Sequence, residues 1–162
     1  MIKVTVFARF KTCMGDVNLI DVLSDIRNGK YATSINRIRA CMDKGDLEAA
    51  DMQKKALPAI TISATYRGQR LVEYMTAYNP LIILDFDDLK KEDLPHLLAL
   101  VREAVYTVAC WISPRGHGIK VIVYPVVGLE LVPQSHPAIY KRVKDWYQRL
   151  LGTKADPSGS DA

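Results

Sequence analysis

The spacing of apolar residues along the chain predicts short strands alternating with amphipathic helices. Apolar and polar residues alternate over residues 1–10 and 59–66, which is typical of strands with one buried face. Residues 81–87 begin with the most apolar stretch of the chain, so we expect a buried strand there. Apolar positions recur at helical spacing in five segments, which predicts five helices. The first would begin at Asp16 as N-cap and end at Gly29, and the other four lie at 35–45, 46–55, 94–105 and 139–152.

The second half of the chain has the order strand, helix, strand, strand, helix. Residues 106–113 and 119–124 are expected to form a hairpin joined by the turn at 114–118. This is the split βαβ order of ferredoxin-like and RNA-recognition-motif folds, without its final strand. We therefore expect an α+β fold: an RNA-recognition-motif-like antiparallel-sheet core at residues 81–162, truncated before its last strand, with an N-terminal α/β extension at residues 1–80 packed on it.

The composition is that of an ordinary globular domain. The 162 residues are 49% hydrophobic and 25% charged, and no run approaches the roughly 20 apolar residues of a membrane helix, so no membrane partner is expected. The three cysteines form no C-x-x-C pair, which disfavours a zinc site or a disulfide framework and favours a reduced, cytoplasmic setting. The net charge of +4 is compatible with a nucleic-acid partner without demonstrating one.

Two carboxylates stand at the end of the most apolar strand. Because side chains alternate along a strand, Asp85 and Asp87 are expected on one face and Phe86 on the other. Ionised carboxylates are costly to bury unless something pairs with them, and Mg²⁺ or Mn²⁺ prefers carboxylate oxygen. The alternative is that these are turn carboxylates near solvent, with Asp88 leading into the next helix.

The turn at 114–118 carries the second group of candidate residues. Its two glycines let the backbone approach a phosphate closely, and successive N–H groups in such a turn form an anion-binding concavity. Hydroxyl, guanidinium, imidazole and ammonium groups surround them. The candidate phosphate-binding residues are Ser113, Arg115, Gly116, His117, Gly118 and Lys120. The alternative is an ordinary hairpin turn with exposed polar residues.

The expected topology brings these groups together. The first and third strands of a split βαβ unit are neighbours, so an antiparallel pairing would place the start of 119–124 beside the end of 81–87. The carboxylates and the turn would then share one face. Asp156, in the loop after the last helix, could join them as a third carboxylate; alternatively it is a loop residue near a chain end.

These three motifs together resemble those of the archaeo-eukaryotic primase, or primase-polymerase, superfamily. They are the D-x-D at Asp85, the Ser…Gly-Ile-Lys turn from Ser113 to Lys120, and the loop aspartate Asp156. More closely, the chain resembles the VirE N-terminal-type domain of bacterial mobile elements over most of its length. The segments that carry this resemblance are 57–64, 78–87, 113–123 and 156–161.

The resemblance implies a catalytic core that holds a nucleoside triphosphate through two Mg²⁺ or Mn²⁺ ions. Asp85, Asp87 and Asp156 would be the metal ligands and catalytic carboxylates. The implied function is primase- or polymerase-like nucleotidyl transfer, or nucleotide and nucleic-acid binding, in a mobile-element replication protein. Single-stranded or primer-template DNA would be its partner, and a C-terminal helicase-type domain would follow in the full-length protein.

Position 120 departs from the motif of that superfamily. Primase-polymerases usually have histidine there, whereas this chain has Lys120 and places His117 three positions earlier. Lysine can hold a phosphate as a point charge but lacks the neutral donor and acceptor chemistry of histidine. Nucleotidyltransferase activity is therefore left open, and the alternative is a catalytically inactive nucleic-acid-binding or protein-interaction module on the same fold.

The two tryptophans fall in apolar periodic stretches. This pattern favours a packing role for Trp111 and Trp146 over a role as platforms on which bases stack.

Overall fold

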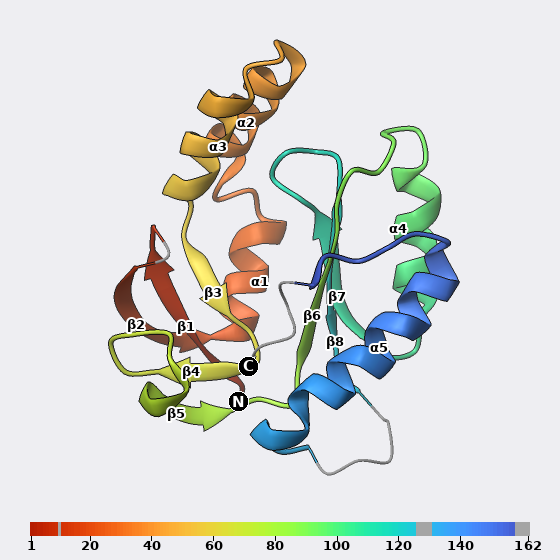
Figure 1. Cartoon of the computed structure of the whole chain (residues 1–162). Coiled ribbons are helices and arrows are strands. Elements are labelled where there is room, and N and C mark those ends of the chain that lie inside the picture. The colour runs from red at the N-terminus through yellow and green to blue at the C-terminus, as the bar shows by residue number, and fades with distance from the viewer. Residues whose placement is uncertain (10, 126–130, 158–162) are drawn as a thin grey trace. The chain divides into compact units, whose positions relative to one another are not determined.

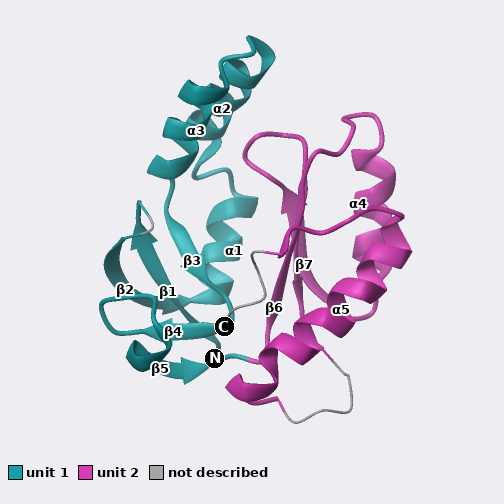
Figure 2. Cartoon of the chain, in the orientation of Figure 1, with its two compact units in different colours: residues 1–79 teal, residues 80–162 magenta. Residues whose placement is uncertain are grey.

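The computed structural model describes residues 1–9, 11–125 and 131–157, and the chain divides into two compact units (Figure 2). Unit 1 comprises residues 1–79 and unit 2 comprises residues 80–162. Five α-helices and three small antiparallel sheets make up the described part of the chain (Figure 1). The expectation of an α+β fold is confirmed. No helix among the described residues is both long and apolar enough to cross a membrane.

Unit 1 contains two small sheets and three helices. Its strands form one sheet in the order β2-β1-β3 and a second sheet from β4 and β5. The elements are β1 (Lys3–Ala8), β2 (Thr12–Asn18), α1 (Leu19–Arg27), α2 (Ala32–Asp43), α3 (Leu47–Ala56), β3 (Ala59–Thr61), β4 (Ala64–Tyr66), the 3₁₀-helix η1 (Val72–Tyr74) and β5 (Met75–Tyr78).

The expectation that Asp16 caps the first helix is wrong. Asp16 lies within strand β2, directly opposite Thr5 of β1, and its Oδ1 accepts a hydrogen bond of 2.6 Å from the Thr5 hydroxyl. The carboxylate is thus satisfied across the sheet rather than at a helix terminus. Helix α1 begins three residues later, at Leu19.

The strand expected at 59–66 is interrupted. Its two halves, β3 and β4, belong to different sheets. Between them, two carbonyl oxygens accept hydrogen bonds from Asn79. The side-chain amide of Asn79 donates to Ile62 (3.1 Å), and its backbone N–H donates to Ser63 (2.8 Å). Because Asn79 supplies these donors, the chain can change sheets without leaving buried carbonyl groups unsatisfied.

Unit 2 is a three-stranded antiparallel sheet with two helices. The strand order is β6-β8-β7, which is the order of the first three strands of a split βαβ fold, and that expectation is confirmed. The elements are β6 (Ile82–Phe86), α4 (Leu94–Glu103), β7 (Thr107–Ile112), β8 (Ile119–Val123), the 3₁₀-helix η2 (Pro133–Ser135) and α5 (His136–Leu151). Pro95 falls in the first turn of α4, and Gly152 ends α5 with a left-handed backbone.

The core of unit 2 lies on one face of this sheet. Figure 1 shows α4 and α5 on the same side of the strands. Alternate residues of β6, namely Ile82, Leu84 and Phe86, are buried against these helices. The intervening residues of each strand therefore project from the opposite face, and the candidate site is on that face.

Candidate functional site

Two cross-strand rows on the face away from α4 and α5 contain most of the candidate residues. In the first row, Lys120 of β8 is opposite both Asp85 of β6 and Trp111 of β7. The second row continues the register beyond the strand ends: Gly118 lies close to Asp87 Oδ1 and Ser113 Oγ. The convergence of the carboxylates and the turn, expected from topology, is confirmed.

Asp85 and Lys120 form an ion pair at the centre of the first row. The Lys120 ammonium donates a hydrogen bond to Asp85 Oδ2, and the two side chains are only 18% and 23% exposed. The other carboxylate oxygen, Asp85 Oδ1, is buried and has no hydrogen-bond partner among the described residues. A buried oxygen of this kind usually has a partner, so Oδ1 is an unsatisfied acceptor at the centre of the row.

Position 118 has no room for a side chain. A Cβ atom there would lie 2.6 Å from the carbonyl oxygen of Phe86, 2.8 Å from Asp87 Oδ1 and 3.0 Å from Ser113 Oγ. The first of these contacts is with backbone, which cannot rotate away. Glycine at 118 is therefore required for the close approach of the two strands and of the Asp87 and Ser113 side chains.

The turn between β7 and β8 is held by three backbone hydrogen bonds. Ser113 N–H donates to the carbonyl of Gly118 (2.8 Å), and Gly116 N–H donates to the carbonyl of Ser113 (3.0 Å). The carbonyl of His117 accepts from Leu89 N–H (2.8 Å), which joins the turn to the segment that follows β6. Ser113 and Gly116 are buried, so the turn is not simply a solvated loop.

The flanking carboxylates and cations differ in exposure. Asp87 and Asp88 are exposed, and Asp88 has a left-handed backbone with φ of 56°. Arg115 and His117 are half-buried. The site thus combines a largely buried carboxylate at 85 with an exposed one at 87, next to a structured turn.

Asp156 lies beside Asp85 through its backbone. Its N–H donates to the carbonyl of Asp85 (2.8 Å), on the edge of β6 that β8 does not occupy. The Tyr140 hydroxyl of α5 donates to the carbonyl of Asp156 (2.7 Å), and residue 156 itself is exposed. The remainder of the third motif, residues 158–161, lies outside the described residues.

The described residues contain no group of three or more His, Cys, Asp or Glu side chains close enough to hold a metal ion. A metal site made by the three carboxylates of Asp85, Asp87 and Asp156 therefore stays a prediction. The backbone contact brings Asp156 next to Asp85 but does not by itself complete such a site.

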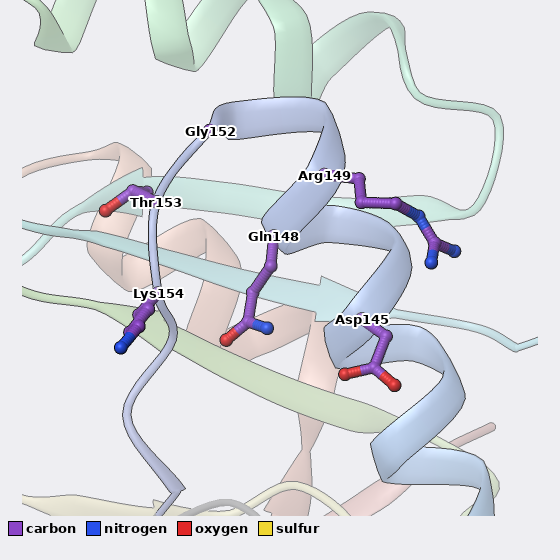
Figure 3. Close-up of a pocket in the computed structure, with 6 residues that line it drawn as sticks. All are labelled: Asp145, Gln148, Arg149, Gly152, Thr153 and Lys154. Atoms are coloured by element: carbon purple, nitrogen blue, oxygen red, sulfur yellow. The ribbon is translucent and has the colours of Figure 1, made fainter.

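The chain that leads to Asp156 is also fastened to α5. A hollow of about 370 Å³ lies at the end of this helix, lined by Asp145, Gln148, Arg149, Gly152, Thr153 and Lys154. Figure 3 draws these residues as sticks. The Gln148 side chain extends toward the 153–155 segment, and its Oε1 accepts a hydrogen bond from Ala155 N–H (3.0 Å). This contact and the Tyr140 contact together position Asp156.

The other side of β7 contributes packing rather than chemistry. Burial raises the pKa of the Cys110 thiol, and burial also raises the pKa of the Tyr147 phenol. Both groups therefore stay protonated at neutral pH. The Tyr147 hydroxyl is hydrogen-bonded to the Thr107 hydroxyl at 2.7 Å, which links α5 to β7.

The two tryptophans occupy different environments. The ring of Trp146 makes edge contacts with Tyr106 and Tyr147, at centroid distances of 6.1 and 4.8 Å, in line with the packing role expected for it. Trp111 is half-buried and lies in the first row of the site, opposite Lys120, rather than in the core under α4 and α5. Periodicity within a strand shows that residues alternate between faces, but it does not show which face a helix covers.

A family model described as BT4734-like, N-terminal domain, matches residues 52–162. This range contains the whole of unit 2 and every candidate site residue. The chain has no significant match among curated proteins or solved structures.

Proposed function

The chain belongs to the BT4734-like, N-terminal domain family, and from the geometry of its site we propose that unit 2 is a primase-polymerase-like core for nucleotidyl transfer. Its substrates would be a nucleoside triphosphate and single-stranded or primer-template DNA, within a cytoplasmic mobile-element replication protein. The observation that supports this most strongly is the β6–β8 register. It places Asp85 opposite Lys120 and brings Asp87 Oδ1 and Ser113 Oγ together over Gly118.

The residues present suit Mg²⁺ or Mn²⁺. Asp85 Oδ1 is a buried acceptor with no hydrogen-bond partner among the described residues, and the exposed Asp87 carboxylate follows it by two positions. Mg²⁺ is commonly held by one or two carboxylates together with substrate phosphates, so three protein ligands are not required. When bound, the metal would neutralise phosphate charge and lower the pKa of an attacking hydroxyl.

The chain's own residues would bind and orient the phosphates. Lys120 supplies a point charge, Arg115 a guanidinium fork, and Ser113 a hydroxyl close to Gly118. An arriving phosphate would compete with Asp85 for the Lys120 ammonium. If the ammonium moves to the phosphate, both oxygens of Asp85 become available to a cation.

Titration with Mn²⁺ tests this proposal on the full 162-residue chain. Paramagnetic broadening of amide signals is expected around residues 85–87 and 113–120, and Asp87→Ala should greatly weaken it. Asp88→Asn is the matched control, because Asp88 is adjacent and exposed and asparagine tolerates its left-handed backbone. No broadening at millimolar Mn²⁺, with or without a nucleoside triphosphate, would exclude the metal-dependent function.

A second candidate function is nucleotide or nucleic-acid binding without catalysis. The observation that favours it is the contact between the Lys120 ammonium and Asp85 Oδ2, which places a fixed positive charge where a metal-binding carboxylate would otherwise be available. A primer-synthesis assay separates the two functions. Labelled products that disappear in Asp87→Ala support catalysis. If the chain binds single-stranded DNA through the DNA phosphates but makes no labelled products, the result supports a binding module without catalysis.

A further inference from the structure

Trp111 lies in the same cross-strand row as the charged residues of the site. It is opposite Lys120 in the β7–β8 register, and Lys120 is opposite Asp85 in the β6–β8 register. Neighbouring strands are about 4.8 Å apart, so the row extends about 10 Å from β6 to β7. One small ligand can therefore contact the Lys120 ammonium and the Trp111 indole at the same time.

The core under α4 and α5 does not use the Trp111 ring. Cys110, the preceding residue, packs against that core, so alternation along β7 directs Trp111 to the other face. Within the part of the chain that the structure describes, the Trp111 side chain has no aromatic partner and no hydrogen bond. A half-buried indole beside a lysine and a glycine-containing turn has the properties of a residue on which a base stacks.

We infer that Trp111 stacks on the base of the nucleotide whose phosphates bind at Lys120 and the 113–118 turn. This inference rests on the proposed function, because it uses the same phosphate site. Ser113 follows Trp111 by two positions, so both project from the same face, in neighbouring rows. The base and the phosphates would then lie one row apart, as the sugar between them requires.

The consequence is selectivity for nucleotides over inorganic polyphosphate. Every base has a flat π-face, so stacking on Trp111 would accept all four bases and favour purines, whose ring faces are larger. The phosphate contacts alone would bind a nucleotide and an inorganic chain of phosphates about equally. Trp111 is thus a specificity-determining residue and not a catalytic one.

Calorimetric titration of the full chain with dATP and with inorganic tripolyphosphate, both with Mg²⁺, tests this role. Trp111→Leu is expected to weaken dATP binding about 5- to 100-fold and to leave tripolyphosphate binding within about two-fold. Trp111→Phe keeps an aromatic face and should restore most of the dATP affinity. Thermal melts of both variants show whether they are folded.

Fluorescence supplies a second readout that needs no change at 111. The chain has two tryptophans, so in Trp146→Phe the tryptophan emission comes from Trp111 alone. Binding of dATP should quench that emission, whereas tripolyphosphate should not. If both ligands bind, but dATP neither quenches Trp111 nor binds more weakly to folded Trp111→Leu, the stacking role is overturned while the phosphate site stands. If neither ligand binds the wild-type chain, the phosphate site and the stacking role are both rejected.

Discussion

Asp85 and Lys120 are directly opposite one another on neighbouring antiparallel strands, and the lysine ammonium donates to one carboxylate oxygen while the other is buried without a hydrogen-bond partner among the described residues. Among the described residues the carboxylate is thus only half satisfied. The lysine ammonium offsets the charge of Asp85, and the proposed metal would be the partner of the second oxygen.

The pair should contribute measurably to stability. Both side chains are mostly buried, so either Asp85→Asn or Lys120→Met leaves the remaining group of the pair without its charged partner. Each variant should therefore lower the free energy of unfolding by about 1–3 kcal/mol. The double variant should lose less than the sum, with a coupling near 1 kcal/mol in urea denaturation. The exposed pair of Lys30 and Asp25 is the control, since Asp25→Asn should leave the urea midpoint unchanged. Additive effects at 85 and 120 would show that the ion pair has no energetic role.

Replacing Lys120 should change metal affinity in the opposite direction to phosphate affinity. Without the ammonium, Asp85 carries an uncompensated charge, so Lys120→Met and, at pH 8, Lys120→His should bind Mn²⁺ several-fold more tightly than the wild type. Lys120→Met should bind tripolyphosphate more weakly, because a point charge near the phosphates is lost. Electron paramagnetic resonance measures free Mn²⁺ directly.

The matched control for this pair of measurements is Lys141→Met. Lys141 is exposed on α5, which covers the face of the sheet opposite the site. The Lys141→Met variant removes the same charge from the protein without altering the surroundings of Asp85. Equal Mn²⁺ affinities in the two methionine variants would mean that Lys120 does not control the Asp85 carboxylate.

Gly118→Ala should impair both folding and binding. Its Cβ would lie 2.6 Å from a backbone oxygen of β6, so the strands must separate, and we expect a loss of about 1–3 kcal/mol in the free energy of unfolding. The same displacement moves Asp87 and Ser113 apart, so Mn²⁺ broadening at 85–87 should weaken. Gly68→Ala is the comparison: its Cβ meets nothing within 4 Å, although its φ of 84° adds backbone strain. It should lower stability without altering Mn²⁺ binding.

The fold of unit 2 was predictable because its local signals agree with each other. The apolar run predicts strand β6, the proline predicts the start of α4 and the glycine predicts the end of α5. Each of these local signals agrees with the element that the structure has there. Unit 1 was less predictable. Strand β2 has few apolar residues and forms only through pairing with β1, whereas Asp16 alone gives a local signal for a helix start.

The candidate site divides in the same way. The nearness of the carboxylates and the turn followed from topology, because the first and third strands of a split βαβ unit are neighbours. The residue-by-residue register that places Lys120 opposite Asp85 did not follow from topology. A shift of one residue in the strand pairing would move every side chain of the strand to the other face of the sheet. The placement of Asp156 depends on hydrogen bonds from Tyr140 and to Gln148, which no sequence pattern indicates.

Asp156 provides the last test, because its backbone and its carboxylate have separable roles. The backbone N–H bonded to the Asp85 carbonyl should be protected from hydrogen exchange, and Asp156→Asn should keep that protection because it changes only the side chain. Tyr140→Phe combined with Gln148→Ala should instead reduce the protection, since both contacts that hold this segment are lost. If Asp156 is the third metal ligand, Asp156→Asn weakens Mn²⁺ binding by at least ten-fold while the amide stays protected. Unchanged Mn²⁺ affinity in that variant would restrict the protein ligands to Asp85 and Asp87 and leave Asp156 as a residue that completes the free edge of β6.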